Sequence, residues 1–381
     1  MNKTRIIPLL TLLALTLAAC QPGTPTPATA TQASLPTVEI ITATSQPTVE
    51  QLPTITPEAQ ATAAPTTTVA ATGGNLADTS SSNYLDDRST PAALMLSYVN
   101  AINRHEYLRA YSYWVNPTPS LGDFDAFTNS FSGVGTESVV IGNISADGAA
   151  GSIYYTLPVL YTDTLANSGT TLKYVSCVVM RLPQPANYGE PPIQPLNFDS
   201  GTKAALNASI SDADALAAAC NGQGSGGPTS APVLENLTDL SANNYIDNRS
   251  GAVEVVSSLL NAINRKEYVR AYSYWQNPSQ TVGNYDNYAA GYNDTGSVSA
   301  VFGTVISDAG AGQFHYQVPV GMIVTTNNNT QQTFIGCYTL HLANPGMQGT
   351  LPFEPLGITA GKFKQISNGT SLSPLLATAC N

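Results

Sequence analysis

The charged residues that could carry acid–base chemistry recur in the same order in the two halves of the chain. Glu106 and Arg109 are three positions apart, a spacing that suits a helix-surface ion pair worth about 0.2–0.5 kcal/mol. Asp147 falls in a predicted turn, and Asp125 lies near a predicted helix start, where a carboxylate suits the helix dipole. We therefore predict a structural role for each repeated charge and no catalytic residue among them. The pairs are Asp86/Asp247, Arg88/Arg249, Arg104/Arg265, Glu106/Glu267, Arg109/Arg270, Asp125/Asp286 and Asp147/Asp308.

The histidines do not recur at matching positions. His105, His315 and His341 align with Lys266, Tyr154 and Arg181 of the other half. A duplicated site that depends on histidine is therefore not expected, and no Gly-x-Ser-x-Gly elbow, phosphate-binding loop or His-Glu-x-x-His motif is present. We predict no metal site and no cofactor.

Aromatic residues are the stronger candidates for ligand contact. Helix spacing predicts Tyr111 and Trp114 on a core face and Tyr113 turned away from it. The two tryptophans have two interpretations. One is packing in the core, and the other is an aromatic-lined pocket for an apolar or sugar ligand. The candidate pocket residues are Tyr113, Trp114, Phe131, Tyr155, Tyr274, Trp275, Tyr292 and Tyr316.

These residues belong to one stretch that the chain contains twice. Residues 100–117 return almost unchanged as residues 261–278, and the similarity continues on both sides. The protein is therefore predicted to be a tandem duplication. We expect a first domain over 81–221, a Gly/Ser/Pro-rich linker over 222–240 and a second domain over 241–381.

Each half begins with helical patterns and continues with strand patterns. Thr90 and Pro91 predict a helix start, followed by helices over 106–115 and 124–131. Alternating residues predict strands over 138–145, 151–162 and 172–182, with turns at Asp147-Gly148 and Asn167-Ser168-Gly169. Pro158 and Pro319 predict a bulge or a sheet edge in the middle strand. No aspartate falls within these predicted apolar strands. The later strands are expected around 195–198 and over 357–366, and those of the second half over 298–307, 312–325 and 333–342.

Four of the five cysteines occupy matching places in the two halves. An oxidising compartment would favour disulfides, and the duplication selects Cys177–Cys220 and Cys337–Cys380 because each half then closes itself. A zinc site is the competing interpretation, but no Cys-x-x-Cys motif is present.

The N-terminus has the pattern of an export signal. Lys3 and Arg5 precede an apolar run, and Leu17-Ala18-Ala19-Cys20 resembles the lipobox of bacterial lipoproteins. We expect a signal peptide over 1–19, lipid attachment at Cys20, and an extracytoplasmic protein anchored to a bacterial membrane by this lipid. The Thr/Pro-rich residues 20–80 predict a disordered stalk.

The amino-acid composition limits the classes of partner that the protein is expected to bind. The net charge is −11 and no basic cluster is present, which argues against nucleic acid. Charged residues make up 10% of the chain, compared with about 25% in an average soluble protein. Few fixed charges are therefore available for catalysis.

The helices followed by an antiparallel sheet, with E-Y-x-R-A-Y-S-Y-W at the second helix, resemble the nuclear transport factor 2-like superfamily. The resemblance implies an α+β fold with two tandem cone-shaped domains, each with N-terminal helices packed on a curved antiparallel sheet. It does not imply an activity, because this fold carries both enzymes and binding proteins.

We hypothesise a non-catalytic, lipid-anchored cell-surface binding or adhesion protein. Its partners would be the membrane, through the lipid anchor, and a cell-wall, glycan or small apolar ligand. One alternative is an isomerase, dehydratase or cyclase that uses a carboxylate and a tyrosine in one cone. Another is an envelope spacer without a ligand.

Overall fold

The computed structural model describes residues 77–220 and 239–381, which we name the first copy and the second copy. The predicted signal peptide, Cys20, nearly all of the stalk and nearly all of the linker lie outside the described residues. Both copies lie within one compact unit, Ala70–Asn381. Among the described residues, no helix has the length and apolar character needed to cross a membrane.

The two copies have the same order of elements. The first copy contains α1 (Pro91–Asn103), α2 (Tyr107–Ser112), α3 (Pro117–Leu121), α4 (Phe124–Ser130), β1 (Val134–Ile141), β2 (Ser145–Ala149), β3 (Ser152–Leu165), β4 (Thr171–Pro183), the short 3-10 helix η1 (Pro185–Asn187), β5 (Asn197–Ala205) and α5 (Asp212–Ala218). The second contains α6 (Ala252–Asn264), α7 (Tyr268–Ser273), α8 (Pro278–Thr281), α9 (Tyr285–Ala290), β6 (Thr295–Phe302), β7 (Ile306–Gly310), β8 (Gln313–Thr326), β9 (Gln331–Ala343), η2 (Pro345–Met347), β10 (Gly357–Ile366) and α10 (Ser373–Leu376).

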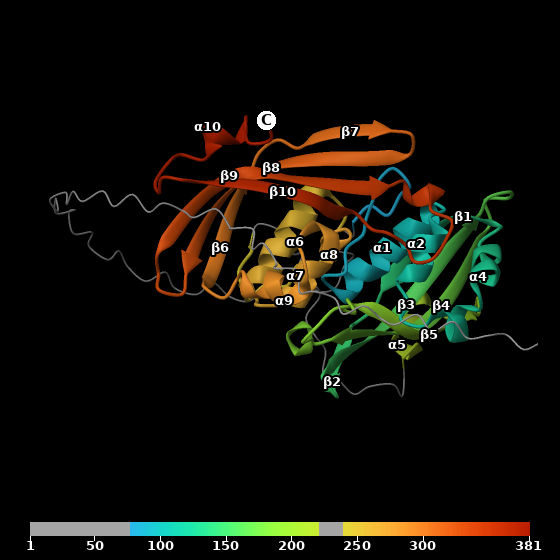
Figure 1. Ribbon diagram of the computed structural model, residues 1–381. Coiled ribbons are helices and arrows are strands. Elements are labelled where there is room, and N and C mark those ends of the chain that lie inside the picture. The colour runs from blue at the N-terminus through green and yellow to red at the C-terminus, as the bar shows by residue number, and fades with distance from the viewer. Residues whose placement is uncertain (1–76, 221–238) are drawn as a thin grey trace, which may run out of the picture. The chain divides into compact units, whose positions relative to one another are not determined.

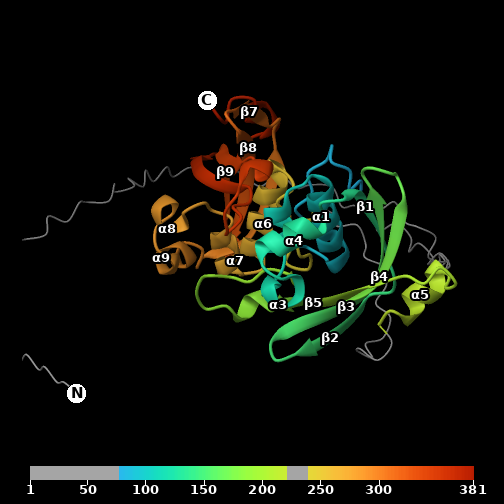
Figure 2. The same ribbon diagram turned by 90° about the vertical axis from the view of Figure 1, so that its right-hand side faces the viewer.

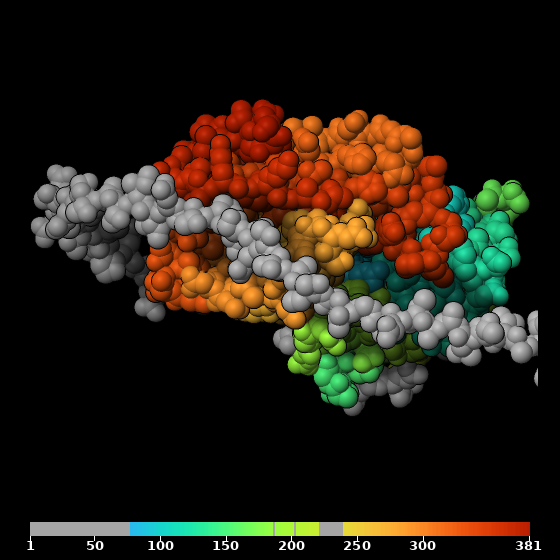
Figure 3. All heavy atoms as spheres, viewed as in Figure 1, coloured from blue at the N-terminus to red at the C-terminus, as the bar shows by residue number. Residues whose placement is uncertain are grey.

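Each copy builds one antiparallel sheet with helices against it, so the predicted α+β class is confirmed. The strand order is β1-β3-β4-β5 with β2 also on β3, and the second copy repeats it as β6-β8-β9-β10 with β7 on β8. In the first copy α1 and α4 lie on the concave side of the sheet and α5 on the other side (Figure 2). In the second copy α6 and α7 lie inside the curve of the sheet (Figure 1), and strand atoms pack directly over helix atoms (Figure 3).

The long first helix forms as its sequence predicts. Thr90 accepts a hydrogen bond from the Ala93 amide, and Pro91 occupies the first turn. Nearly all of α1 is buried, which makes it the centre of the first core. The second helix is shorter than predicted and ends at Ser112, and Pro117 begins the additional helix α3.

The turn predicted at Asp147-Gly148 is wrong. These residues lie inside β2, and the chain reverses at Ala150-Gly151, whose φ angles are 47° and 74°. The second copy reverses in the same way at Ala311-Gly312, with φ angles of 52° and 75°. Two consecutive left-handed residues match the right-handed twist of the flanking strands, which explains the position of this hairpin turn.

Pro158 does not lie at a sheet edge, but the register beside it is irregular as predicted, since Ile141 pairs with Val159 whereas Ser145 pairs with Thr156 and one extra residue lies between them. The register of Pro158 with Cys177 of β4 is continuous, and on the other side the neighbouring chain changes there from β1 to β2. The proline carbonyl accepts a hydrogen bond from the Gly142 amide at 2.8 Å. Pro319 accepts the equivalent bond from Gly303 at 2.9 Å. The missing proline N–H therefore coincides with a break between two partner strands.

Both predicted disulfides are present. Cys177–Cys220 and Cys337–Cys380 each join residues 43 apart, with Cα atoms 5.0 Å apart. Each bond ties the end of its copy to the third long strand, β4 or β9. By chain entropy, a closed loop of this length stabilises the fold by about 4 kcal/mol.

A short antiparallel contact joins the two copies, and we name it the copy–copy bridge (residues 86–89 and 247–250). The Arg88 amide donates to the Asp247 carbonyl at 2.7 Å, and the Arg249 amide donates to the Asp86 carbonyl at 2.6 Å. The hydroxyls of Ser250 and Ser89 accept from the Asp86 and Asp247 amides, each at 2.8 Å. Because these four bonds form two equivalent pairs, the bridge has local pseudo-twofold symmetry.

One pair in the bridge breaks that symmetry. Asp87 lies opposite Asn248 and accepts a hydrogen bond from the Asn248 amide nitrogen at 2.9 Å. Asp87 Oδ1 accepts a hydrogen bond from the Ser89 amide, and Asn248 Oδ1 accepts one from the Ser250 amide. Two asparagines would place donor against donor here, and two aspartates would place charge against charge.

We expect Asp87→Asn and Asn248→Asp each to lower the free energy of unfolding, by about 1–3 kcal/mol, the cost of an unmade hydrogen bond at a partly buried site. The double variant exchanges donor and acceptor, so it should recover most of that loss. Chemical denaturation of the four proteins measures the coupling. Simple addition of the two single losses in the double variant would contradict this account of the bridge.

Candidate functional site

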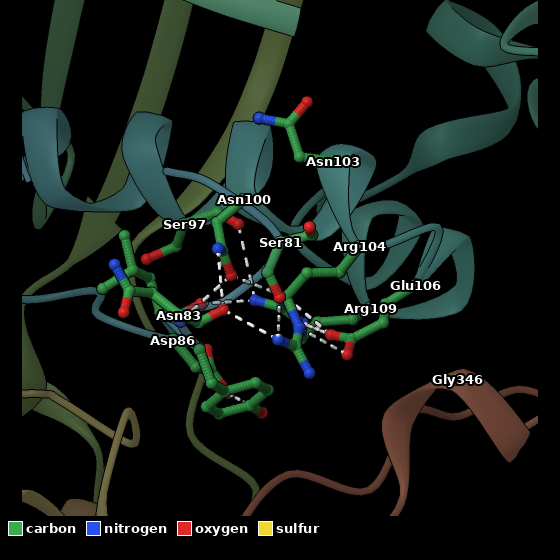
Figure 4. Close-up of polar contacts among 12 residues, drawn as sticks. Ser81, Asn83, Asp86, Ser97, Asn100, Asn103, Arg104, Glu106, Arg109 and Gly346 are labelled. Atoms are coloured by element: carbon green, nitrogen blue, oxygen red, sulfur yellow. Dashed lines mark hydrogen bonds and ion pairs between the residues drawn. The ribbon is translucent and has the colours of Figure 1, made fainter. Parts of the chain in front are cut away.

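The repeated charges of the second helix are buried, not on the surface. The Arg109 side chain is fully buried and donates to Glu106 at 2.7 Å, to the Tyr113 hydroxyl at 3.0 Å and to Asn100 at 3.0 Å. The predicted surface pair of Glu106 and Arg109 is therefore wrong. Their spacing does place them on one helix face, but that face packs against the segment that precedes α1 (Figure 4).

The buried arginine fixes the segment that forms the copy–copy bridge. Arg109 also donates to the Leu85 carbonyl, and the Leu85 amide donates to Asn100 at 3.0 Å. The Tyr113 hydroxyl donates to the Asp86 carboxylate at 3.0 Å. In the second copy, Arg270 makes the equivalent bonds to Glu267, Tyr274, Asn261 and Ile246. Most of the repeated charges therefore serve one structural purpose, which is to shape the bridge.

The predicted pocket residues separate into different environments. Tyr113 and Tyr274 are fully buried in the arginine networks, so the predicted outward orientation is wrong. Trp114 stacks on Phe198 with ring centroids 5.0 Å apart. Phe131 stacks on Tyr107, and Tyr292 stacks on Tyr268. Tyr155 on β3 and Tyr316 on β8 are part-buried. Trp275, together with Tyr274, lines a surface hollow of about 200 Å³.

A charged cluster that occurs in one copy is the better candidate site. Glu137 on β1 and Asp163 on β3 are cross-strand partners. Lys203 on β5 reaches across the sheet face, with its ammonium 3.0 Å from Glu137 Oε2 and 3.3 Å from Asp163 Oδ2. Both carboxylates are buried, whereas the lysine side chain is 36% exposed. The cluster thus connects the interior of the first copy with solvent.

Aromatic rings surround the ammonium group of this cluster. Lys203 Nζ lies 4.7 Å from the ring centroids of Tyr161 and Tyr174 and 6.0 Å from that of Phe131. Such distances allow cation–π attraction. Phe131, one of the predicted pocket residues, is therefore next to the site, although Trp114 is not part of these contacts.

The surroundings of Glu137 raise the pKa of its carboxyl group. Burial raises the pKa of Glu137 to about 7, and Asp163 adds to this by its charge and by a hydrogen bond between the two side chains, while Lys203 opposes it. Glu137 Oε1 and Asp163 Oδ1 are buried with no donor hydrogen facing them when both groups are ionised. Glu137 can therefore keep its proton up to near neutral pH, and that proton would satisfy one of the two buried oxygens.

The second copy replaces the whole cluster with apolar residues. By strand register, Glu137 and Asp163 correspond to Val298 and Val324, and Lys203 corresponds to Phe363. The surrounding tyrosines change as well: Tyr161 and Tyr174 correspond to Met322 and Phe334. The two copies therefore share their bridge but differ at this cluster.

Sequence reasoning missed the cluster for two reasons. The search for charges shared by both halves excluded residues present in only one. The predicted middle strand also ended at residue 162, one residue before Asp163, although β3 continues to Leu165. The alternation of Tyr161, Asp163 and Leu165 was the available signal, because these side chains share one face of a strand.

We expect the triple variant Glu137→Val, Asp163→Val, Lys203→Phe to fold, because the second copy packs these residues at the same places. It should be more stable than Lys203→Met alone by about 1 kcal/mol or more. The single change leaves two buried carboxylates without their cation, although exposure of Lys203 keeps the loss below the ~3–5 kcal/mol of a fully buried pair. Denaturant unfolding of the unmodified protein, the single variant and the triple variant gives their order of stability. A triple variant less stable than Lys203→Met would contradict the correspondence between the two copies at these positions.

We also expect the cluster to make stability depend on pH. A carboxyl whose pKa is higher in the folded than in the unfolded protein binds its proton more tightly when folded. The free energy of unfolding should therefore fall as pH rises from about 4.5 to about 7. Burial also raises the pKa of Asp87, to about 6, and the triple variant keeps that residue. Its free energy of unfolding should therefore still fall as pH rises, but without the contribution of Glu137. Identical pH profiles of the two proteins would exclude a proton held at the cluster.

No family model matches the chain, and a comparison with curated proteins found no relative. The differences between its two copies are therefore the main guide to function.

Proposed function

We propose that the protein is a non-catalytic, lipid-anchored binding protein outside the cytoplasm and that its first copy contacts the ligand. The observation that carries this proposal is the polar cluster of the first copy, which the second copy replaces with Val298, Val324 and Phe363. A duplicated scaffold that retains buried charges in one copy has a site there that the fold itself does not require.

The chemistry of the cluster favours a neutral, polyhydroxylated ligand such as a glycan. Lys203 offers an ammonium group at the surface, and the Tyr174 ring beside it is half-buried. Aromatic faces and charged hydrogen-bonding groups together suit sugar rings. Two carboxylates and a net charge of −11 disfavour an anionic ligand.

The anchored location is part of the same proposal. The lipobox-like Leu17-Ala18-Ala19-Cys20 and the Thr/Pro-rich stalk support it, and the two disulfides are compatible with an oxidising compartment. The order of helices followed by a curved antiparallel sheet supports a relationship to the nuclear transport factor 2-like superfamily, with each copy as one cone-shaped domain.

A proton-transfer enzyme is a second candidate, because a buried carboxyl with a pKa of about 7 suits general acid–base catalysis. Tyr161 and Lys203 would then orient the substrate over Glu137. An enzyme would convert the bound compound, whereas a binding protein would release it unchanged. Mass spectrometry of the compound after incubation with the protein distinguishes the two.

We expect the full-length protein in detergent to bind members of a neutral oligosaccharide array. Lys203→Met and Tyr174→Ala should each weaken that binding about tenfold, equivalent to about 1.4 kcal/mol. Lys362→Met, a surface lysine on β10 of the second copy, is the matched control and should bind as the unmodified protein does. Equal binding by all variants would exclude the cluster as the site, and absence of binding to every probe would favour the spacer alternative.

A further inference from the structure

The second copy brings together two histidines that lie far apart in sequence. His315 on β8 and His341 on β9 are direct cross-strand partners. Their ring centroids are 4.9 Å apart, and the rings are inclined by 32°. His315 is exposed and His341 is part-buried, so the pair is open to solvent on one side.

The hydrogen bonds of His341 fix which of its ring nitrogens carries the proton. The Gln276 amide nitrogen donates to the His341 carbonyl at 3.0 Å, which turns the Gln276 side-chain oxygen toward His341 Nδ1 at 3.1 Å. Nδ1 therefore donates to that oxygen. Nε2 is left with a lone pair, and it lies 2.5 Å from the side-chain oxygen of Gln313.

Nε2 thus presents its lone pair toward the Gln313 side chain, whose amide group can turn either its nitrogen or its oxygen toward it. The neutral imidazole is the form that binds metal ions. A cation bound at Nε2 would take up this lone pair, and the Gln313 oxygen would move outward from its 2.5 Å contact to become a further ligand.

We propose that His315, His341 and the side-chain oxygen of Gln313 form a surface site for a divalent transition-metal cation such as Zn²⁺ or Cu²⁺. Zinc–imidazole bonds are about 2.0–2.1 Å long, so two nitrogens must come within about 4 Å, which rotation of the exposed His315 side chain allows. Imidazole ligands suit zinc and copper, and the Gln276 oxygen on Nδ1 supplies an outer hydrogen-bond acceptor that orients His341.

The site has few protein ligands and therefore open positions. The described residues contain no group of three or more His, Cys, Asp or Glu side chains that could hold a metal ion. Gln276 and Glu354 also line the adjacent hollow of about 200 Å³. Water or a small ligand in that hollow would complete the coordination of the ion.

The first copy provides an internal contrast. Tyr154 and Arg181 are the cross-strand partners at the same register, and Arg181 lies over the Tyr154 ring at 5.8 Å. Arg181 also donates to Ser152, the counterpart of Gln313, at 3.1 Å. A fixed guanidinium therefore fills the place where the second copy has two neutral imidazoles.

The test is titration of the full-length, untagged protein in detergent with Zn²⁺ and Cu²⁺ by isothermal calorimetry, with Mg²⁺ as a hard-cation control. We expect one Zn²⁺ or Cu²⁺ per chain and no Mg²⁺ binding. His315→Ala and His341→Ala should each weaken binding more than about tenfold, and Gln276→Met should weaken it about 10- to 100-fold through the outer hydrogen bond. His105→Ala, a change at the remaining histidine, should leave binding unchanged.

A gain of function provides a second test. Tyr154→His combined with Arg181→His recreates the pair in the first copy, and the stoichiometry should rise toward two ions per chain. Thermal unfolding in the presence of a chelator checks that every variant folds. The proposal is overturned if the unmodified protein binds neither Zn²⁺ nor Cu²⁺, or if both alanine variants bind as it does.

Discussion

A buried guanidinium in each copy is the interaction on which the rest of the structure depends. Arg109 and Arg270 are removed from water, a change that is costly unless every donor finds an acceptor. Glutamate, asparagine, tyrosine and a backbone carbonyl supply those acceptors in both networks. Because these bonds hold the chain that enters the first long helix, the same residues determine where the two copies meet.

Features that depend on neighbours in sequence could be predicted from sequence. The cap at Thr90, the helix order and the last strand of the second copy, Gly357–Ile366, follow from local patterns. The disulfides followed from the duplication. Burial of Glu106 and Arg109 could not be predicted, since a spacing of three residues places them on one helix face without deciding whether that face meets water or protein.

The candidate sites could not be predicted from the sequence for a related reason. Comparison of the two halves finds what they share, and here the shared residues shape the scaffold. Glu137, Lys203 and the two histidines of the β-sheet are specific to one copy, and register alone brings them together. A pair of residues that oppose each other across neighbouring strands leaves no local signal, because the loop and register between them are set by tertiary packing.

The unlike pair Asp87 and Asn248 has a consequence for the history of the molecule. Two identical ancestral units could have associated through the same segment as a symmetric homodimer, with equal residues meeting on the axis. A single chain with one unit of each kind can hold complementary side chains at this position. Each half is therefore matched to the other, and association of two like halves would set charge against charge or donor against donor. The duplication thereby permits an internal contact that two identical units could not form.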